Sequence, residues 1–167
     1  MSINVAVLTV SDRCYKGERQ DLSGPALCQK VQELGWNLVA TAIVPDEMDQ
    51  IKAYLVNQST SGKVNLILTS GGTGFAPRDI TPEATLSVIE KRASGLVERI
   101  RNESSKSNPH AFLSRAEAGI RNKCLILNLP GSPSGAVDSL MVISNILPHA
   151  LALLQQSPEA EDHQVKN

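Results

Sequence analysis

The stretch Leu66–Thr85, LILTSGGTGFAPRDITPEAT, combines an apolar segment, a glycine-rich loop and the start of a helix. The apolar run Val64–Leu68 predicts a buried strand, which breaks into the loop Gly71–Gly74. Thr81-Pro82-Glu83 then predicts the beginning of a helix, because proline is favoured in the first turn. In an open α/β sheet, ligands bind beside loops of this kind, at the carboxyl ends of the strands. The stretch therefore predicts an α/β fold with a ligand site at residues 71–74.

The residue types in this loop favour a ligand that contains phosphate. Three glycines in four residues allow positive φ and a close backbone approach, so that amide N–H groups face an anion. Asp79 offers an acid for a cation, and Arg78 offers a base for further phosphate. Two general phosphate motifs are absent, since no lysine follows the glycines and Pro77 occupies the last glycine position of GxGxxG. Spacing alone leaves two interpretations open, a structural turn and a nucleotide-type site.

Composition narrows the class of protein. A length of 167 residues suits one domain, and 41% hydrophobic with only 3% aromatic residues predicts an aliphatic core. The net charge of −1 argues against a chain that coats nucleic acid. Three scattered cysteines without a CxxC pair suit reduced thiols. Because no apolar run reaches membrane-spanning length and no signal-type segment is present, we expect a cytoplasmic protein that binds no membrane.

Predicted strands alternate with predicted helices along the chain. Further apolar runs predict strands at Ile3–Val10, Trp36–Val44 and Cys124–Leu129. Helices are expected at 24–34, from 46 to about 58, at 82–91, at 95–104 and at 134–155. This alternation predicts a three-layer α/β/α sandwich around a mostly parallel sheet, formed by residues 1–156 as a single domain. The polar residues 157–167 are expected to form a disordered tail.

Details of these elements also follow from single residues. Ser23 is expected to cap the helix at 24–34, and Gly35 to close it. Pro148 is expected to kink the last helix, because proline removes one amide donor. Residues 16–21, KGERQD, are expected to form a mobile polar loop. Asp46 could simply cap the helix that follows it.

Three loops are expected at strand carboxyl ends: Ser11-Asp12-Arg13, Gly71–Gly74 and Pro130–Pro133. If the strands before them are neighbours, these loops share one edge of the sheet and form one pocket.

The segment TSGGTGFAPRDITPEAT, together with VAVLTVSDR at the start and ILNLPGSP later, resembles the molybdopterin adenylyltransferase family. That family includes MogA and MoaB proteins and the G domains of a plant molybdenum-cofactor protein and of gephyrin. The resemblance covers nearly the whole chain. It implies a MogA/MoaB-like fold and a role in molybdenum cofactor biosynthesis, in which MgATP adenylylates molybdopterin and pyrophosphate is released. It also implies a homotrimer and a molybdenum insertase of the MoeA type as a partner.

The resemblance assigns roles to the residues that match the family motifs. Asp46 and Asp79 match two important acids and are expected to bind Mg²⁺ and position the triphosphate. Ser11 and Asp12 match a segment near the nucleotide. The remaining matches are Gly71, Gly72, Thr73 and Gly74 for the nucleotide phosphates, Pro130 and Gly131 for the adenosine side, and Ser114 and Arg115 for molybdopterin. Ser132 departs from the Asn or Gln often found at its position.

Alternatives remain open at this point. Asp12 could cap a turn, and Asp79 could accept a turn bond from the Thr81 amide. Arg115 could be an ordinary surface arginine, and Arg78 could pair with Asp79 rather than with substrate. At the level of function, the alternatives are a molybdopterin-binding or scaffold module without turnover, and a nucleotide pyrophosphatase on the same fold. Retention of both acids, GGTG and PRD favours catalysis.

Overall fold

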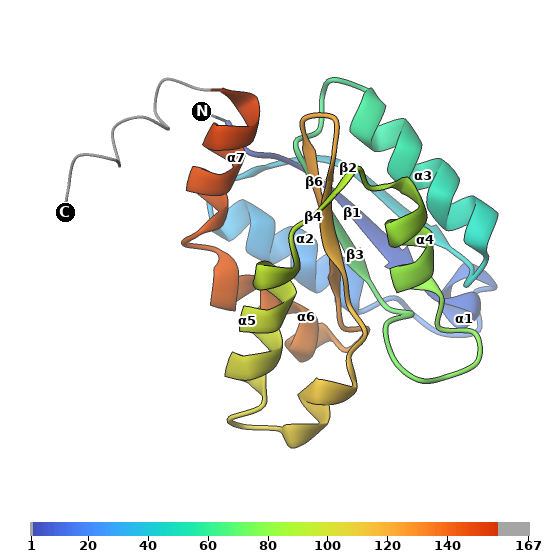
Figure 1. Ribbon diagram of the computed structural model, residues 1–167. Coiled ribbons are helices and arrows are strands. Elements are labelled where there is room, and N and C mark those ends of the chain that lie inside the picture. Colours follow the sequence, from blue (N-terminus) through green and yellow to red (C-terminus); the bar gives the residue numbers. More distant parts are fainter. Residues whose placement is uncertain (1, 157–167) are drawn as a thin grey trace.

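A computed structural model describes residues 2–156, which are built around one six-stranded sheet (Figure 1). The strand order is β2-β1-β3-β6-β5-β4. The first four strands run parallel, whereas β5 is antiparallel to both of its neighbours. The strands are β1 (Asn4–Val10), β2 (Asn37–Val44), β3 (Leu66–Ser70), β4 (Lys91–Arg92), β5 (Ala118–Arg121) and β6 (Cys124–Leu129). The predicted mostly parallel sheet is confirmed.

Helices cover both faces of this sheet (Figure 1). Helices α2, α5, α6 and α7 pack on one face, while α3 and α4 pack on the other. This arrangement confirms the three-layer α/β/α sandwich. The helices are α1 (Asp12–Tyr15), α2 (Ser23–Glu33), α3 (Met48–Thr60), α4 (Thr81–Val88), α5 (Ser94–Ser104), the 3₁₀ helix η1 (Pro109–Leu113), α6 (Pro133–Ile143) and α7 (Leu147–Gln155).

Burial on both faces explains why the central strands are continuous apolar runs. Along β1, Val5 and Val7 join the cluster under α2, whereas Ala6 and Leu8 join the cluster under α3. Successive side chains point to opposite faces of a sheet, so a strand covered on both sides needs an apolar residue at every position. Each large aliphatic side chain that is fully buried contributes about 1.5–3 kcal/mol.

The C-terminal helix differs from its prediction. The expected single kinked helix is two helices, α6 and α7, bent by 65° at the break between them. Pro148 lies in the first turn of α7, where a missing amide costs no helical bond, so it begins a helix instead of kinking one. Among the described residues, no single helix is long and apolar enough to cross a membrane, although the bent pair together passes that test.

One other local prediction was wrong, one pair of strands was not predicted, and one prediction was confirmed. Ser23 is the first residue of α2 rather than its cap, and the Asp21 carboxylate accepts the Gly24 amide at 3.0 Å. The antiparallel pair β4–β5 was missed, since β4 has two residues and both are exposed. Gly35 closes α2 with a φ of +75°, as expected. The tail predicted at 157–167 lies outside the described residues.

The strand register places the key loops beside one another. Val10 of β1 pairs with Val44 of β2, and Thr9 pairs with Ser70 of β3. Ser70 in turn pairs with Leu129 of β6. The four parallel strands therefore end at the same rim, where the loop after β3 lies close to α1 (Figure 1).

A buried polar group behind this rim generates a stability prediction. Asn128 is 1% exposed, and its amide donates to the Thr69 and Thr85 hydroxyls at 3.0 and 2.8 Å. Its side-chain oxygen accepts the Glu117 amide at 3.1 Å. We expect Asn128→Ala to lower the free energy of unfolding by about 3 kcal/mol, because buried partners lose their hydrogen bonds. Urea unfolding measures this loss. Asn102→Ala, at an exposed helical position, is the control, and equal losses in both variants would contradict the prediction.

Candidate functional site

A cavity of about 380 Å³ opens at the carboxyl ends of the parallel strands. It is lined from the turns after β1, β2, β3 and β6, as the sequence predicted for its three loops. Six of the predicted site residues line it: Ser11, Asp46, Gly71, Gly72, Asp79 and Gly131. Asp46 and Asp79 thus lie in one cavity with the glycine loop.

The glycine loop needs glycine because other chain segments approach it closely. Gly71 has a φ of +104°, and a Cβ there would lie 2.3 Å from the Val10 carbonyl oxygen. Gly72 has a φ of +65°, and its Cβ would lie 2.3 Å from the Thr81 hydroxyl oxygen. That hydroxyl donates to the Gly71 carbonyl at 2.9 Å, which ties the loop to the start of α4. The predicted positive φ is confirmed at Gly71 and Gly72.

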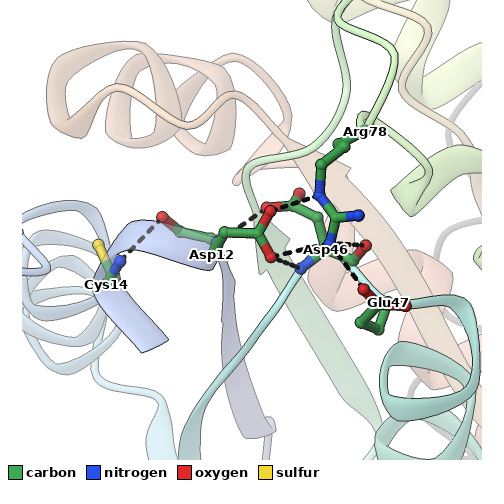
Figure 2. A network of polar contacts seen from close by, with 6 residues as sticks. Asp12, Cys14, Asp46, Glu47 and Arg78 are labelled. Atoms are coloured by element: carbon green, nitrogen blue, oxygen red, sulfur yellow. Dashed lines mark hydrogen bonds and ion pairs between the residues drawn. The ribbon is translucent and has the colours of Figure 1, made fainter. Parts of the chain in front are cut away.

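Asp12 and Asp46 join the ends of β1 and β2 through two reciprocal hydrogen bonds (Figure 2). The Asp12 amide donates to Asp46 Oδ2 at 2.9 Å, and the Asp46 amide donates to Asp12 Oδ1 at 3.0 Å. Asp46 is therefore not the cap of α3, whose cap position is held by Glu47 without a side-chain bond. Nor does Asp12 cap α1, because Ser11 does so by accepting the Cys14 amide.

Arg78, from the loop after β3, contacts both residues of this pair (Figure 2). Its guanidinium donates to both Asp12 carboxylate oxygens, to the Asp46 carbonyl at 3.1 Å and to Glu47 Oε1 at 2.7 Å. The alternative pairing of Arg78 with Asp79 is therefore wrong. The hydrogen bond from Arg78 is the main cause that holds the pKa of Asp12 below its usual range.

The pKa of Asp46 moves in the opposite direction. Burial is the largest cause of its rise, and the negative charges of Asp12 and Asp79 raise it further, while the bond from the Asp12 amide opposes them. The charged form of Asp46 is thus disfavoured until a cation compensates it. Because a proton competes with such a cation, cation binding at Asp46 is expected to weaken as the pH falls through this raised pKa.

The two cavity carboxylates fit magnesium better than a metal held by protein alone. Among residues 2–156, no group of three or more His, Cys, Asp or Glu side chains could hold a metal ion. Mg²⁺ is commonly bound through one or two carboxylates, with substrate phosphates and water completing its shell. Asp46 and Asp79 would supply those carboxylates beside the glycine loop.

Asp79 is held by its own loop. Its Oδ2 accepts the Ala76 amide at 3.0 Å, whereas the Thr81 amide donates to the Gly72 carbonyl, so the alternative of a turn bond from Thr81 to Asp79 is wrong. A Cβ at Gly74 would lie 2.9 Å from Asp79 Oδ2, which explains the third glycine of the loop. Thr73, between Gly72 and Gly74, is buried, with 7% of its surface exposed.

A second cavity, of about 520 Å³, lies on the other side of the loop after β6. Ser114 and Pro130 line it, and Ser132 lines both cavities. The Ser132 hydroxyl accepts the Gly135 amide at 3.2 Å and so caps α6. The structure therefore places eight of the predicted site residues in two neighbouring cavities, with the loop at 130–132 between them. The other four line neither cavity: Asp12, Thr73, Gly74 and Arg115.

The sequence reasoning missed part of the first cavity. Arg19 and Asp21 line it, although residues 16–21 were expected to be only a mobile loop. Asp21 accepts the buried Thr9 hydroxyl at 2.7 Å, which anchors this loop to β1. A charged run directly before a helix was the only local signal, and it did not reveal a contact across twelve residues.

The fold and this rim define an α/β domain in which a glycine-rich loop and two carboxylates, Asp46 and Asp79, line one cavity. Residues 6–149 match the family model described as a probable molybdopterin binding domain. A molybdopterin adenylyltransferase of Helicobacter pylori is 42% identical over 92% of this chain and 88% of its own length. The chain belongs to the molybdopterin adenylyltransferase family.

Two further comparisons agree with this membership. The Drosophila melanogaster molybdenum cofactor synthesis protein cinnamon is 46% identical over 92% of this chain. The chain spans about a quarter of the length of cinnamon, 26%. The crystal structure of MoaB from Thermus thermophilus superposes with a TM-score of 0.88 at 44% identity, covering 93% of this chain and 98% of that one.

The ion pair between Arg78 and Asp12 yields a titration prediction. We expect Arg78→Gln to raise the pKa of Asp12 toward its ordinary value, because the main group that favours its charged form is gone. Carboxyl-carbon NMR titration measures this pKa. Arg13→Gln removes the same charge one residue from Asp12 at an exposed position and serves as the control. An unchanged pKa in Arg78→Gln, or an equal rise in both variants, would refute the assignment.

Proposed function

We propose that this protein transfers an adenylyl group from MgATP to the terminal phosphate of molybdopterin, a step of molybdenum cofactor biosynthesis. The observation that carries the proposal is the meeting of Asp46, Asp79 and the glycine loop in one cavity. The similarity of this chain, over 92% of its length, to a molybdopterin adenylyltransferase supports the choice of substrates.

The proposed reaction joins two anions. A terminal phosphate oxygen of molybdopterin attacks the α-phosphorus of ATP, the bond from that phosphorus to the bridging oxygen of the β-phosphate breaks, and pyrophosphate leaves. Positioning and charge neutralisation supply most of the catalysis in such transfers. Asp46 and Asp79 would hold Mg²⁺, which when bound offsets the charge of the triphosphate. The Gly71 amide donates to the Leu129 carbonyl at 3.2 Å, so the backbone amides of residues 72–74 and the Thr73 hydroxyl would orient the phosphates.

The two cavities suggest where each substrate binds. In this proposal the nucleotide occupies the first cavity, with Ser11 beside it and Gly131 as part of its wall. Molybdopterin occupies the second cavity, where Ser114 and Pro130 lie. The loop at 130–132 lies between them, so Pro130 would touch the pterin side rather than the adenosine side on which it was first placed. Asp12 would act on the nucleotide through Asp46, since its own oxygens are held by Arg78 and the Asp46 amide.

Removing one carboxylate charge tests the proposed metal role. We expect Asp46→Asn and Asp79→Asn each to lower the rate of adenylyl-molybdopterin formation by about 100-fold or more, because one magnesium ligand loses its charge. Molybdopterin affinity should stay within about twofold. Mass detection of the adenylate measures the rate, and Asp49→Asn, an exposed position in the first turn of α3, is the control.

The same assay separates the alternative functions. Full turnover by both variants would refute the metal role of these acids. Wild-type protein that binds molybdopterin but forms no adenylate with MgATP would indicate a binding or scaffold module. Release of AMP and pyrophosphate without adenylated pterin would indicate a nucleotide pyrophosphatase.

We also propose a cytoplasmic homotrimer that passes its product to a molybdenum insertase of the MoeA type, with residues 1–156 acting as one domain. Strand β2 is at the edge of the sheet and exposes Val39 and Ile43, which offer apolar surface for a second copy. We expect sedimentation velocity at micromolar concentration to give three times the 17.9 kDa of the chain. A monomer under these conditions would count against the trimer.

A further inference from the structure

Arg115 makes an unusual set of contacts with the loop that carries Asp79. Its guanidinium donates through Nε to the Gly74 carbonyl at 2.8 Å and through Nη2 to the Asp79 carbonyl at 2.7 Å. Nη1 pairs with Glu83 at the start of α4. The Arg115 amide donates to the Thr73 carbonyl at 2.8 Å. One residue thus holds both ends of segment 74–79.

The backbone of Arg115 is itself held in place. Arg101 on α5 donates from Nη1 to the Ser114 carbonyl at 3.3 Å and to the Ala116 carbonyl at 3.1 Å. These two bonds flank Arg115 on both sides in the chain. Segment 74–79 is therefore connected through Arg115 to the helix layer on the opposite face of the sheet.

These contacts occupy three of the five N–H groups of the Arg115 guanidinium. All three nitrogens thus bond the loop or α4, through two carbonyls and a carboxylate, and Arg115 lines neither of the two cavities described above. It lines a third, open cavity on the outer side of segment 74–79, together with Phe75 and Pro77. Its neighbour Ser114 lines the second cavity, so the two residues differ in role although they are adjacent.

We propose that Arg115 is a positioning residue for Asp79 and does not contact molybdopterin. By fixing the Gly74 and Asp79 carbonyls, it sets the path of the loop that brings the Asp79 carboxylate into the first cavity. The planar guanidinium fork suits this task, because it reaches three acceptors in fixed directions, which the single ammonium of lysine does not. This inference rests on the proposed function only for its kinetic consequences.

The kinetic test separates positioning from substrate contact. For Arg115→Lys and Arg115→Ala, we expect kcat to fall by about 10–100-fold and the half-saturating Mg²⁺ concentration to rise about tenfold, because a misplaced ligand weakens the metal and the alignment of the reactants. The KM for molybdopterin should stay within about twofold. Millimolar guanidinium ion should restore part of the activity of Arg115→Ala. A raised KM for molybdopterin with unchanged Mg²⁺ dependence would overturn the proposal.

A second measurement needs no turnover and uses the ligand-free protein. We expect hydrogen exchange at the Ala76 and Asp79 amides, which bond within segment 74–79, to be at least about tenfold faster in Arg115→Lys than in wild type. Glu83→Gln, which alters only the Nη1 partner, should give a smaller increase. Unchanged exchange in Arg115→Lys would overturn the positioning role.

Controls distinguish failure of the positioning role of Arg115 from failure of the proposed function. Arg99→Lys is matched, because Arg99 also donates to a backbone carbonyl, that of Val142, but lies on α5 away from the loop. It should leave exchange in segment 74–79 unchanged. If wild-type protein forms no adenylate while Arg115→Lys still accelerates exchange, the function is wrong and the positioning role stands.

Discussion

The hydrogen-bonded register of the parallel strands is the constraint on which the rest depends. Because β1, β2, β3 and β6 end at the same level, four turns from distant parts of the chain meet at one rim. The aliphatic residues on both faces hold this register, since a slip by one residue would move every side chain to the opposite layer. The site is thus a consequence of core packing.

Bringing these turns together also brings negative charges together. Burial makes the charge on Asp46 costly, and the nearby charges of Asp12 and Asp79 raise the pKa of Asp46 further. Arg78 compensates Asp12, and the reciprocal amide bonds compensate part of the rest. The remaining negative charge, on Asp46 and Asp79, lies at the cavity, where a bound cation would offset it.

Two arginines fix the loop between β3 and α4 from different directions. Arg78, within the loop, holds the turns after β1 and β2, while Arg115 holds the ends of segment 74–79 from the chain before β5. Both donate to backbone carbonyls as well as to carboxylates. Bonds to backbone carbonyls fix the conformation of the loop backbone, and that backbone in turn positions the side chains at the site.

Local sequence patterns predicted the central strands, the glycine loop and the edge of the sheet at which the cavity lies. The central strands follow from apolar runs, the glycine loop from its composition and the cavity from the alternation of strands and helices. The family resemblance added the expected substrates and the expected importance of Asp46 and Asp79. The short pair β4–β5 and the break before α7 were missed because neither leaves a strong periodic signal over so few residues.

Only the tertiary structure decided which polar groups pair. Arg78 pairs with Asp12 across 66 residues rather than with the adjacent Asp79, and Arg115 reaches back 41 residues to Gly74. Sequence periodicity reports which face of an element is apolar, and it carries no information on which distant donor meets which acceptor. That choice depends on how the loops meet after the sheet has formed, so the sequence determined the sandwich and its rim, and the fold determined the roles of the arginines.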